Sequence, residues 1–434
     1  MNESLLRISP LLNEKYYKIT HKSGLNIYVC PKDVSTAFAA VAVQYGGAVC
    51  DYRLSSDEEY IHIPDGTAHF LEHKMFEQEG GVDAFDYFAQ TGADANAFTS
   101  SLTTCYLFSC TESFEDSLAI LLDMVTHPHF TDESVEREME IISQEIKMCE
   151  DQPGDALYYG LMNALYHKNN QRIRVAGTVD SITGITADTL LDIHGVFYNL
   201  HNMALFVCGN VTSEKVLSVA DDLLTEMTDV PFEVLRDEEP AEPVSKRFVC
   251  EMQISKPLFS IGVKDTDISD DPGERMKKQC IMDILNDVLF SRASSFRSDL
   301  YESGLISPSL SYGFTHCLEI SHNVISGESS DPEAVYEKYT AYIAQMQKDG
   351  IDPAAFERCK RVLYANCVSS FDDASEICHN MMDTILDGED PFEEPQIIAS
   401  ITVEDANRVL RELFIEEKTA MAVVLPRKNK NKEE

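Results

Sequence analysis

The strands and helices predicted for this chain follow the same order twice, on either side of a short stretch rich in proline and acid. The first series ends with a helix at 182–198 and a strand at 203–209, and the second with a helix at 402–414 and a strand at 420–425. A chain of 434 residues is also too long for one compact core. We therefore predict an α+β fold made by internal duplication of a unit of roughly 200 residues.

The stretch between the two series marks a domain boundary. Residues 236–246 lose hydrophobic periodicity and gather proline and glutamate, which is typical of a linker. The predicted domains are an N-terminal half at 1–235 and a C-terminal half at 247–434. The helix of the second half that corresponds to the histidine motif described below carries no histidine over 280–291. Only the first half can therefore hold a metal through such a motif.

The two halves are predicted in more detail from hydrophobic periodicity and from helix and turn signals. In the first half we expect a hairpin at 15–30, strands at 36–45, 95–100, 103–110 and 203–209, and helices at 64–80, 84–90, 114–127, 132–148, 155–166, 182–198 and 213–227. In the second we expect strands at 247–253, 257–264, 308–314, 317–326 and 420–425, and helices at 273–291, 332–348, 353–369, 373–387 and 402–414.

The composition excludes one class of partner and indicates a compartment. With a formal net charge of -39 at pH 7, the chain would repel the phosphate backbone of a nucleic acid. Its twelve cysteines form no C-x-x-C pair, which indicates reduced, buried thiols. The chain begins without a secretory-signal pattern and has no run of about 18 apolar residues. We expect a soluble cytoplasmic protein with no nucleic-acid or membrane partner.

An H-x-x-E-H sequence, formed by His69, Glu72 and His73, indicates the chemistry of the chain. At helical spacing the three side chains share one face, so two imidazoles and a carboxylate converge. This set suits zinc hydrolysis, because the imidazoles can hold the ion while the carboxylate takes a proton from water. The alternative is two histidines on a helix beside a solvated acid. A catalytic zinc also requires a third protein ligand.

Glutamates of the predicted helix at 132–148 could supply the third ligand, and spacing alone does not select one. Glu138 and Glu145 are seven residues apart and share a face, whereas Glu140 points elsewhere. Glu145 has isoleucine neighbours, so solvation explains its position least well. The alternative is that all the acids of this helix coat an exposed surface. They are Glu133, Glu136, Glu138, Glu140 and Glu145.

Three stretches of the first half together carry a resemblance. They read Ala-His-Phe-Leu-Glu-His-Lys-Met-Phe at 68–76, Ala-Asn-Ala-Phe-Thr-Ser at 95–100 and Glu-Arg-Glu-Met-Glu-Ile-Ile-Ser-Gln-Glu-Ile at 136–146, with Thr104 and Tyr106 after the second. The chain resembles the pitrilysin/insulinase family of zinc metallopeptidases, the inverzincins, and above all its compact bacterial members, which often occur as paired paralogues. The resemblance implies two homologous α/β-sandwich halves that form a clam-shell around a chamber.

The resemblance also implies roles for individual residues. Glu72 is the implied general base, and Glu138 supports the site from outside the ligand set. Asn96 and Ala97 match an edge strand on which a peptide substrate aligns as an extra strand. The alternative for 96–100 is an ordinary strand. The implied ligands of Zn²⁺ are His69, His73 and Glu145.

One part of the family pattern is missing from the second half. Active members place an arginine, and seven residues later a tyrosine, where they contact the substrate carbonyl, but these positions align with Leu300 and Ser307. Such a contact typically contributes a factor of about 10² to 10³ in rate. Either Arg297, Tyr301 or Tyr312 replaces it, or a partner chain does, or the protein cleaves poorly.

These observations favour a zinc-dependent endopeptidase in which a zinc-activated water attacks the peptide bond and Glu72 is the general base. The alternative is a non-catalytic or weakly active peptide-binding subunit of a heterodimeric peptidase. A closed structural zinc would need a further cysteine or histidine beside the site, and the nearest, His62, precedes the helix. The expected partner is a peptide substrate. The sequence leaves open whether the active unit is a homodimer, a heterodimer with a paralogue or a monomer.

Overall fold

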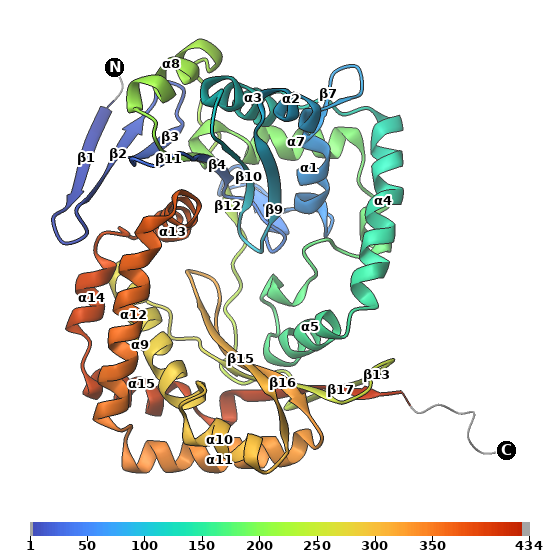
Figure 1. Cartoon of the computed structure of the whole chain (residues 1–434). Helices are drawn as coiled ribbons and strands as arrows, with labels where there is room; N and C mark the ends of the chain where they lie inside the picture. Colours follow the sequence, from blue (N-terminus) through green and yellow to red (C-terminus); the bar gives the residue numbers. More distant parts are fainter. Residues whose placement is uncertain (1–2, 428–434) are drawn as a thin grey trace.

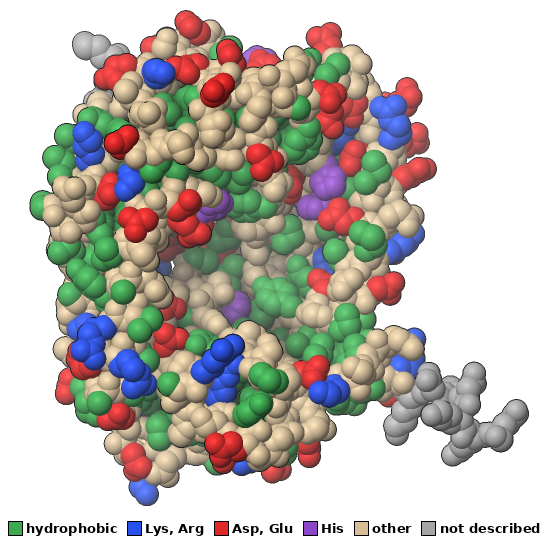
Figure 2. All heavy atoms as spheres, viewed as in Figure 1, with side chains coloured by type: hydrophobic (Ala, Val, Ile, Leu, Met, Phe, Trp, Pro, Cys, Tyr) green, Lys and Arg blue, Asp and Glu red, His purple; other side chains and the backbone are tan. Residues whose placement is uncertain are grey.

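The computed structural model describes residues 3–427, which form two large β-sheets, one from each half of the sequence. Each sheet and most of its helices occupy one end of the molecule (Figure 1). The space-filling view shows a hollow between the two ends, with acidic, histidine and hydrophobic side chains along its walls (Figure 2). The predicted α+β fold of two halves is confirmed.

Within the described residues, the first sheet has seven strands in the order β1-β2-β3-β11-β4-β10-β9. β3 and β11 run parallel, and the other neighbouring pairs are antiparallel. The strands are β1 (Glu3–Ser9), β2 (Glu14–Thr20), β3 (Asn26–Pro31), β4 (Ala37–Val43), β9 (Asp94–Thr99), β10 (Thr104–Cys110) and β11 (Met203–Gly209). β1 was not predicted; leucines and an isoleucine on this edge strand are exposed rather than alternately buried, so it lacks the usual pattern.

Helices of the first half cover one face of this sheet, and the main core lies between them. It joins strand residues such as Val41 to Phe70, Leu121 and Leu190 of three helices. The helices are α1 (Thr67–Met75), α2 (Ala84–Thr91), α3 (Phe114–Thr126), α4 (Asp132–Glu150), α6 (Val179–Ile182), α7 (Ala187–Phe197) and α8 (Ser213–Leu223). The helix predicted at 182–198 begins later, at Ala187 of α7, because the Thr186 side chain caps it there by accepting the N–H of Thr189.

The second sheet repeats the central pattern of the first. Its order is β13-β17-β14-β16-β15, so β17 lies parallel to β13 and antiparallel to β14, as β11 lies between β3 and β4. The strands are β13 (Arg247–Met252), β14 (Leu258–Lys264), β15 (Ile306–His316), β16 (Ser321–Ser329) and β17 (Thr419–Pro426). The helices packed with this sheet are α9 (Pro272–Phe290), α10 (Ser295–Glu302), α11 (Pro332–Asp349), α12 (Pro353–Ser369), α14 (Glu394–Ser400) and α15 (Val403–Leu413).

Each half also provides one helix that covers the sheet of the other. α5 (Pro153–Leu165) packs on β13, β14 and β17, and α13 (Ala374–Leu386) packs on β4 and β11. Figure 1 shows α13, in orange, beside the blue strands of the first sheet. Both faces of each central strand are thereby covered, which explains why β4 and β11 are buried along their whole length.

Residues 235–246 connect the halves without a helix or strand, and a side chain of this segment bonds to both halves. The Glu239 carboxylate accepts hydrogen bonds from the backbone N–H groups of residues 167–169. It also forms an ion pair with the fully buried Lys264. The remaining short elements are strands β5 (Asp51–Arg53), β6 (Ile61–His62), β7 (Glu77–Gln78), β8 (Val82–Asp83) and β12 (Glu233–Val234), and 3₁₀ turns at Asn170–Arg172, Leu200–Asn202, Ser370–Asp372 and Glu416–Lys418.

Among residues 3–427, no helix combines the length and the apolar character that crossing a membrane requires.

Candidate metal centre

The histidine motif lies on α1, which begins just after Gly66. Gly66 has φ 95°, and a Cβ there would lie 2.5 Å from the carbonyl oxygen of Ala176, so the position requires glycine. The helix ends at Met75, earlier than the predicted stop at Gly80 and Gly81. Those two glycines instead form the turn between β7 and β8, which explains the shorter helix.

One face of α1 presents the two imidazoles to α4. The rings of His69 and His73 have centroids 4.6 Å apart. His69 Nε2 lies 3.6 Å from Glu145 Oε1, and His73 Nε2 lies 3.5 Å from Glu145 Oε2. Potential ligand atoms of the three residues all lie within 4.8 Å of one another, and no other group of this kind is found in the described part of the chain. The fold thus brings together residues 76 positions apart in sequence.

Glu138 holds His73 from the other side. Its Oε1 lies 2.9 Å from His73 Nδ1, so the imidazole turns Nε2 towards Glu145. Burial lowers the pKa of His73, but the hydrogen bond and charge of Glu138, with the charges of Glu145 and Glu72, outweigh burial and raise it overall. The pKa of Glu145 is lowered, chiefly by the hydrogen bond from His69, although burial opposes this.

The geometry of this set fits a zinc ion. Ligand atoms about 2.0–2.2 Å from a tetrahedral zinc lie about 3.4 Å from one another, close to the two nitrogen–oxygen distances observed. Two nitrogens and one carboxylate also leave a fourth position open, as a catalytic zinc requires. Glu138 supplies the outer hydrogen bond that a metal-bound imidazole commonly makes. His69 differs, because its buried Nδ1 has no hydrogen-bond partner among the described residues.

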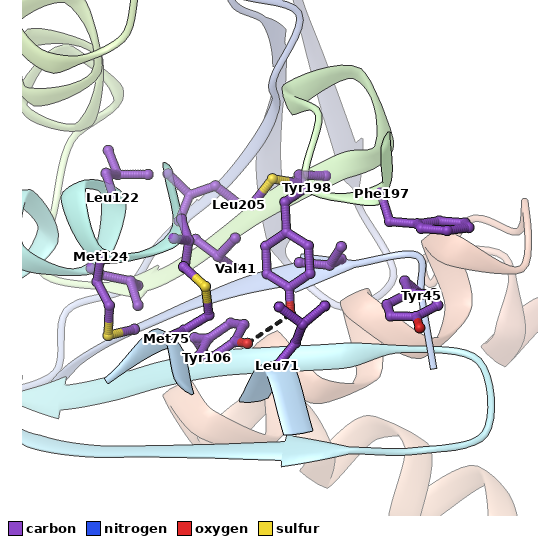
Figure 3. Close-up of a cluster of buried hydrophobic side chains, with 14 of the residues drawn as sticks. Val41, Tyr45, Leu71, Met75, Tyr106, Leu122, Met124, Phe197, Tyr198 and Leu205 are labelled. Atoms are coloured by element: carbon purple, nitrogen blue, oxygen red, sulfur yellow. Dashed lines mark hydrogen bonds between the residues drawn. The ribbon is translucent and has the colours of Figure 1, made fainter. Parts of the chain in front are cut away.

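Glu72 lies on the same face of α1 and is tied to the edge strand. Thr99 Oγ1 donates a hydrogen bond to Glu72 Oε2 at 2.5 Å. In the hydrophobic core, the hydroxyls of Tyr106 and Tyr198 lie 2.7 Å apart (Figure 3). Thr99 belongs to the stretch at 95–100 that carries the resemblance, but the sequence assigned it no role. Only its hydroxyl, near the end of the predicted strand, could have indicated one.

β9, which contains Asn96 and Ala97, forms one edge of the first sheet. It pairs with β10, and no other described strand pairs with it. Asn96 is exposed, and its Oδ1 accepts a hydrogen bond from the N–H of Ala97 at 2.9 Å. α1 packs directly against β9, so the open edge lies next to the histidines.

The second half places none of its three candidate residues in a described contact with this cluster. Leu300, at the aligned arginine position, is fully buried in the second core. The Arg297 guanidinium donates to the carbonyl oxygens of Pro308 and Leu310. Tyr312 donates to Asp287 at 2.8 Å, and Tyr301 is exposed.

Comparison with known proteins identifies the family. Residues 57–179 match the family model described as insulinase (peptidase family M16), and residues 184–363 match the peptidase M16 inactive domain. A Bacillus subtilis protein named uncharacterized zinc protease YmfH is 30% identical over 422 residues, which cover 96% of this chain and 98% of that protein. The chain belongs to the M16 (insulinase) peptidase family. The inactive-domain match begins in the first half, after the histidine motif, and extends through much of the second half, which carries no such motif.

Solved structures support the same fold. A putative M16-like peptidase from Alicyclobacillus acidocaldarius is 29% identical and superimposes with a TM-score of 0.92, covering 97% of this chain and 100% of that one. Pitrilysin, at 14% identity and a TM-score of 0.72, shares the fold over 98% of this chain but only 46% of its own. This M16 chain therefore corresponds in fold to about half of pitrilysin.

Proposed function

We propose that this M16 protein is a zinc-dependent endopeptidase that hydrolyses peptides. The observation that carries the proposal is the convergence of His69, His73 and Glu145 beside Glu72, at the open edge of β9. A metal set, a proton acceptor and a strand that can align a peptide are the three components that metal-assisted peptide hydrolysis requires. The relatives named zinc proteases support the same metal and reaction.

In this proposal His69 and His73 bind zinc through Nε2 and Glu145 through its carboxylate. When bound, the ion supplies Lewis acidity to the attacking water and the scissile carbonyl. Glu138 accepts a hydrogen bond from Nδ1–H of His73, which leaves Nε2 as the unprotonated nitrogen and orients it towards the metal position.

Glu72 moves the proton. Because Oε2 of its carboxylate already accepts a hydrogen bond from Thr99, Oε1 is the atom that takes the proton from the attacking water. The same oxygen then delivers that proton to the leaving amine. A positioned base of this kind contributes about 10² to 10⁴ in rate.

The substrate binds as an added strand. The free edge of β9 offers backbone donors and acceptors to an extended peptide, and Asn96 and Ala97 lie at its centre. Main-chain pairing fixes the register of the peptide, which brings one carbonyl to the zinc face of α1 while alternate side chains point to opposite faces.

A second candidate function is a binding or weakly active subunit of a heterodimeric peptidase. It is favoured by Leu300, which is buried where active relatives are expected to carry a carbonyl-contacting arginine. The correspondence of this chain to about half of pitrilysin also supports a second M16 chain as partner, in a homodimer or a heterodimer. The partner would then supply the missing contact.

We also propose the domain organisation and compartment expected from the sequence. The N-terminal half at 1–235 carries the metal, 236–246 is the linker, and 247–434 is the half without metal ligands. The twelve cysteines are free thiols, which supports a reducing cytoplasmic compartment.

The proposal is tested by metal analysis and peptide cleavage on the same samples. Purified protein should contain zinc, cleave a quenched peptide library, and lose cleavage on chelation with recovery on zinc addition. Glu72→Gln should lower kcat by about 10² to 10⁴ while retaining zinc. The matched control is Glu140→Gln, an exposed glutamate of α4, which should change neither quantity.

The outcomes separate the two candidate functions. Unchanged cleavage by Glu72→Gln would rule out the proposed base. Cleavage that occurs only after addition of a second M16 chain, and that is lost with Glu72→Gln, would identify this chain as the catalytic subunit of a pair. Cleavage of the pair that survives Glu72→Gln would identify it as the binding subunit.

A further inference from the structure

α13 brings two polar side chains of the second half to the substrate strand of the first. His379 and Asp383 are four residues apart on this helix and therefore share a face. The His379 ring centroid lies 5.3 Å from that of Phe38 in β4 and 6.3 Å from that of Phe98 in β9. The face of α13 that carries the two side chains therefore reaches the edge of the sheet at which the peptide is proposed to bind.

Asp383 lies one helical turn beyond His379 on α13, close enough to the first sheet for its charge to act on a residue of β10. After burial, its charge is the strongest influence that raises the pKa of the Cys105 thiol in β10, and the charge of Glu72 adds to it. Cys105 is opposite Phe98 in the β10–β9 register. Asp383 and the proposed base Glu72 therefore both lie near the Cys105–Phe98 rung.

The Asp383 carboxylate has no hydrogen-bond or ion-pair partner among residues 3–427, and the residue is exposed. Even so, the surrounding protein raises the pKa of Asp383, an effect that the nearby His379 opposes. The side chain therefore touches water while neighbouring protein restricts its hydration. An unpaired carboxylate in such a site attracts cations more strongly than one on an open surface.

His379 leaves one ring nitrogen available. Its Nδ1 lies 2.8 Å from the carbonyl oxygen of Ser375, to which it donates, and no described residue bonds its Nε2. Phe98 is half-buried, so part of its ring can also contact a ligand. The three side chains thus combine an aromatic surface, an imidazole with a free ring nitrogen and an unpaired anion.

Strand geometry indicates which substrate atoms reach this place. A peptide paired with β9 lies about 4.8 Å beyond it and directs alternate side chains to the face that carries Asn96 and Phe98. Because Thr99, the neighbour of Phe98, contacts Glu72, the side chain beside Phe98 belongs to a residue within about two positions of the scissile bond, at about 3.3 Å per residue.

We propose that Phe98, His379 and Asp383 form a subsite for one basic side chain, lysine or arginine, of an extended peptide. The inference rests on the proposed function and names the substrate chemistry of that site. Phe98 contacts the aliphatic stem and the cation, Asp383 pairs with the charge, and His379 Nε2 accepts a hydrogen bond from it. An acidic side chain would meet Asp383 as a like charge.

Peptide binding to the zinc-loaded, full-length Glu72→Gln protein tests this subsite without cleavage. The probes are fluorescein-labelled twelve-residue peptides, neutral except for one lysine, glutamine or glutamate moved along the chain, and the readout is anisotropy. Lysine at one position should bind about three- to tenfold more tightly than glutamine. Asp383→Asn should remove this gain, and Asp383→Lys should transfer it to glutamate. Glu357→Gln, which removes an exposed charge from α12, should leave it unchanged.

The experiment distinguishes failure of the subsite from failure of the proposed function. If peptides bind but lysine gives no gain at any position, or the gain survives Asp383→Asn and Asp383→Lys, the subsite is overturned and the proposed function stands. If no peptide binds and the wild-type protein hydrolyses none, alone or with a second M16 chain, the proposed function is overturned and the subsite falls with it.

Discussion

Thr99 donates a hydrogen bond from Oγ1 to Glu72 Oε2 at 2.5 Å, and this contact joins the edge strand to the proposed base. The Thr99 hydroxyl also lies 3.4 Å from that of Thr104, which in turn donates to the carbonyl oxygen of Tyr45. The base is therefore oriented by the strand on which the substrate is proposed to align. In the proposed mechanism, docking a peptide on β9 and presenting Oε1 of Glu72 to the attacking water are therefore parts of one arrangement.

Thr99→Val should lower kcat and leave KM nearly unchanged. Valine keeps the shape and strand propensity of threonine but removes the hydroxyl, so Glu72 loses its orientation while β9 remains. A hydrogen bond to a charged group contributes about 1.5–3 kcal/mol, which corresponds to a loss of about 10- to 100-fold in kcat. Thr99→Ser should retain most of the activity. Steady-state kinetics measures kcat and KM of both variants. An unchanged kcat for the valine variant would refute the role of Thr99 in orienting Glu72.

Glu138→Gln should weaken zinc binding rather than abolish it. The amide keeps the size of the side chain but removes the charge that holds the Nδ1 proton of His73. Loss of such an outer partner typically reduces metal affinity about 10- to 100-fold. Competition with a chromophoric chelator measures the affinity, and Glu140→Gln on the same helix serves as the control. Equal affinity in the two variants would show that Glu138 does not support the site.

Gly160→Ala should destabilise the contact between the halves. Gly160 lies on α5, and a Cβ there would lie 2.3 Å from the Phe248 ring in β13. Overpacking of this kind costs about 1–3 kcal/mol, partly offset by the better helix propensity of alanine. Gly154→Ala is the matched control, because nothing lies within 4 Å of its added Cβ. Denaturant unfolding compares the free energies of unfolding of the two variants. If the ring causes the clash, Gly160→Ala should destabilise less in a Phe248→Ala background than in the wild type.

Local sequence patterns predicted the helices that carry the candidate metal ligands. Thr131 begins α4 with a capping box, as its threonine and early acids indicate, and the periodicity of both helices put His69, Glu72 and His73 on one face and Glu138 and Glu145 on another. These features depend on neighbours within a few residues. The family resemblance then selected Glu145 among the acids, which spacing alone did not.

Contacts between distant segments could not be read in this way. The Thr99–Glu72 hydrogen bond joins residues 27 positions apart, and His379 reaches Phe98 only because α13 crosses to the other half. The apolar periodicity of α13 predicted a helix with a buried face, but it carried no information about which sheet would cover that face. The same holds for α5, whose partner sheet belongs to the second half.

The stability of this protein should fall between pH 5 and 8 because of Glu389, next to α13. Burial, followed by the charge of Asp387, raises the pKa of Glu389 from 4.5 to about 8, although Arg275 opposes the shift. In this window the folded protein keeps a proton that the unfolded chain releases. Stability therefore declines as pH rises, because the unfolded state binds fewer protons than the folded state.

Glu389→Gln removes this titration, so its free energy of unfolding should decline less than that of the wild type over the same window. The difference between the two proteins should grow by on the order of 1–2 kcal/mol from pH 5 to pH 8, a value reduced because the side chain is only half-buried. Urea unfolding at pH 5, 6, 7 and 8 measures it, with the exposed Glu357→Gln as control. A difference that stays constant with pH would show that Glu389 is ionised in the folded protein.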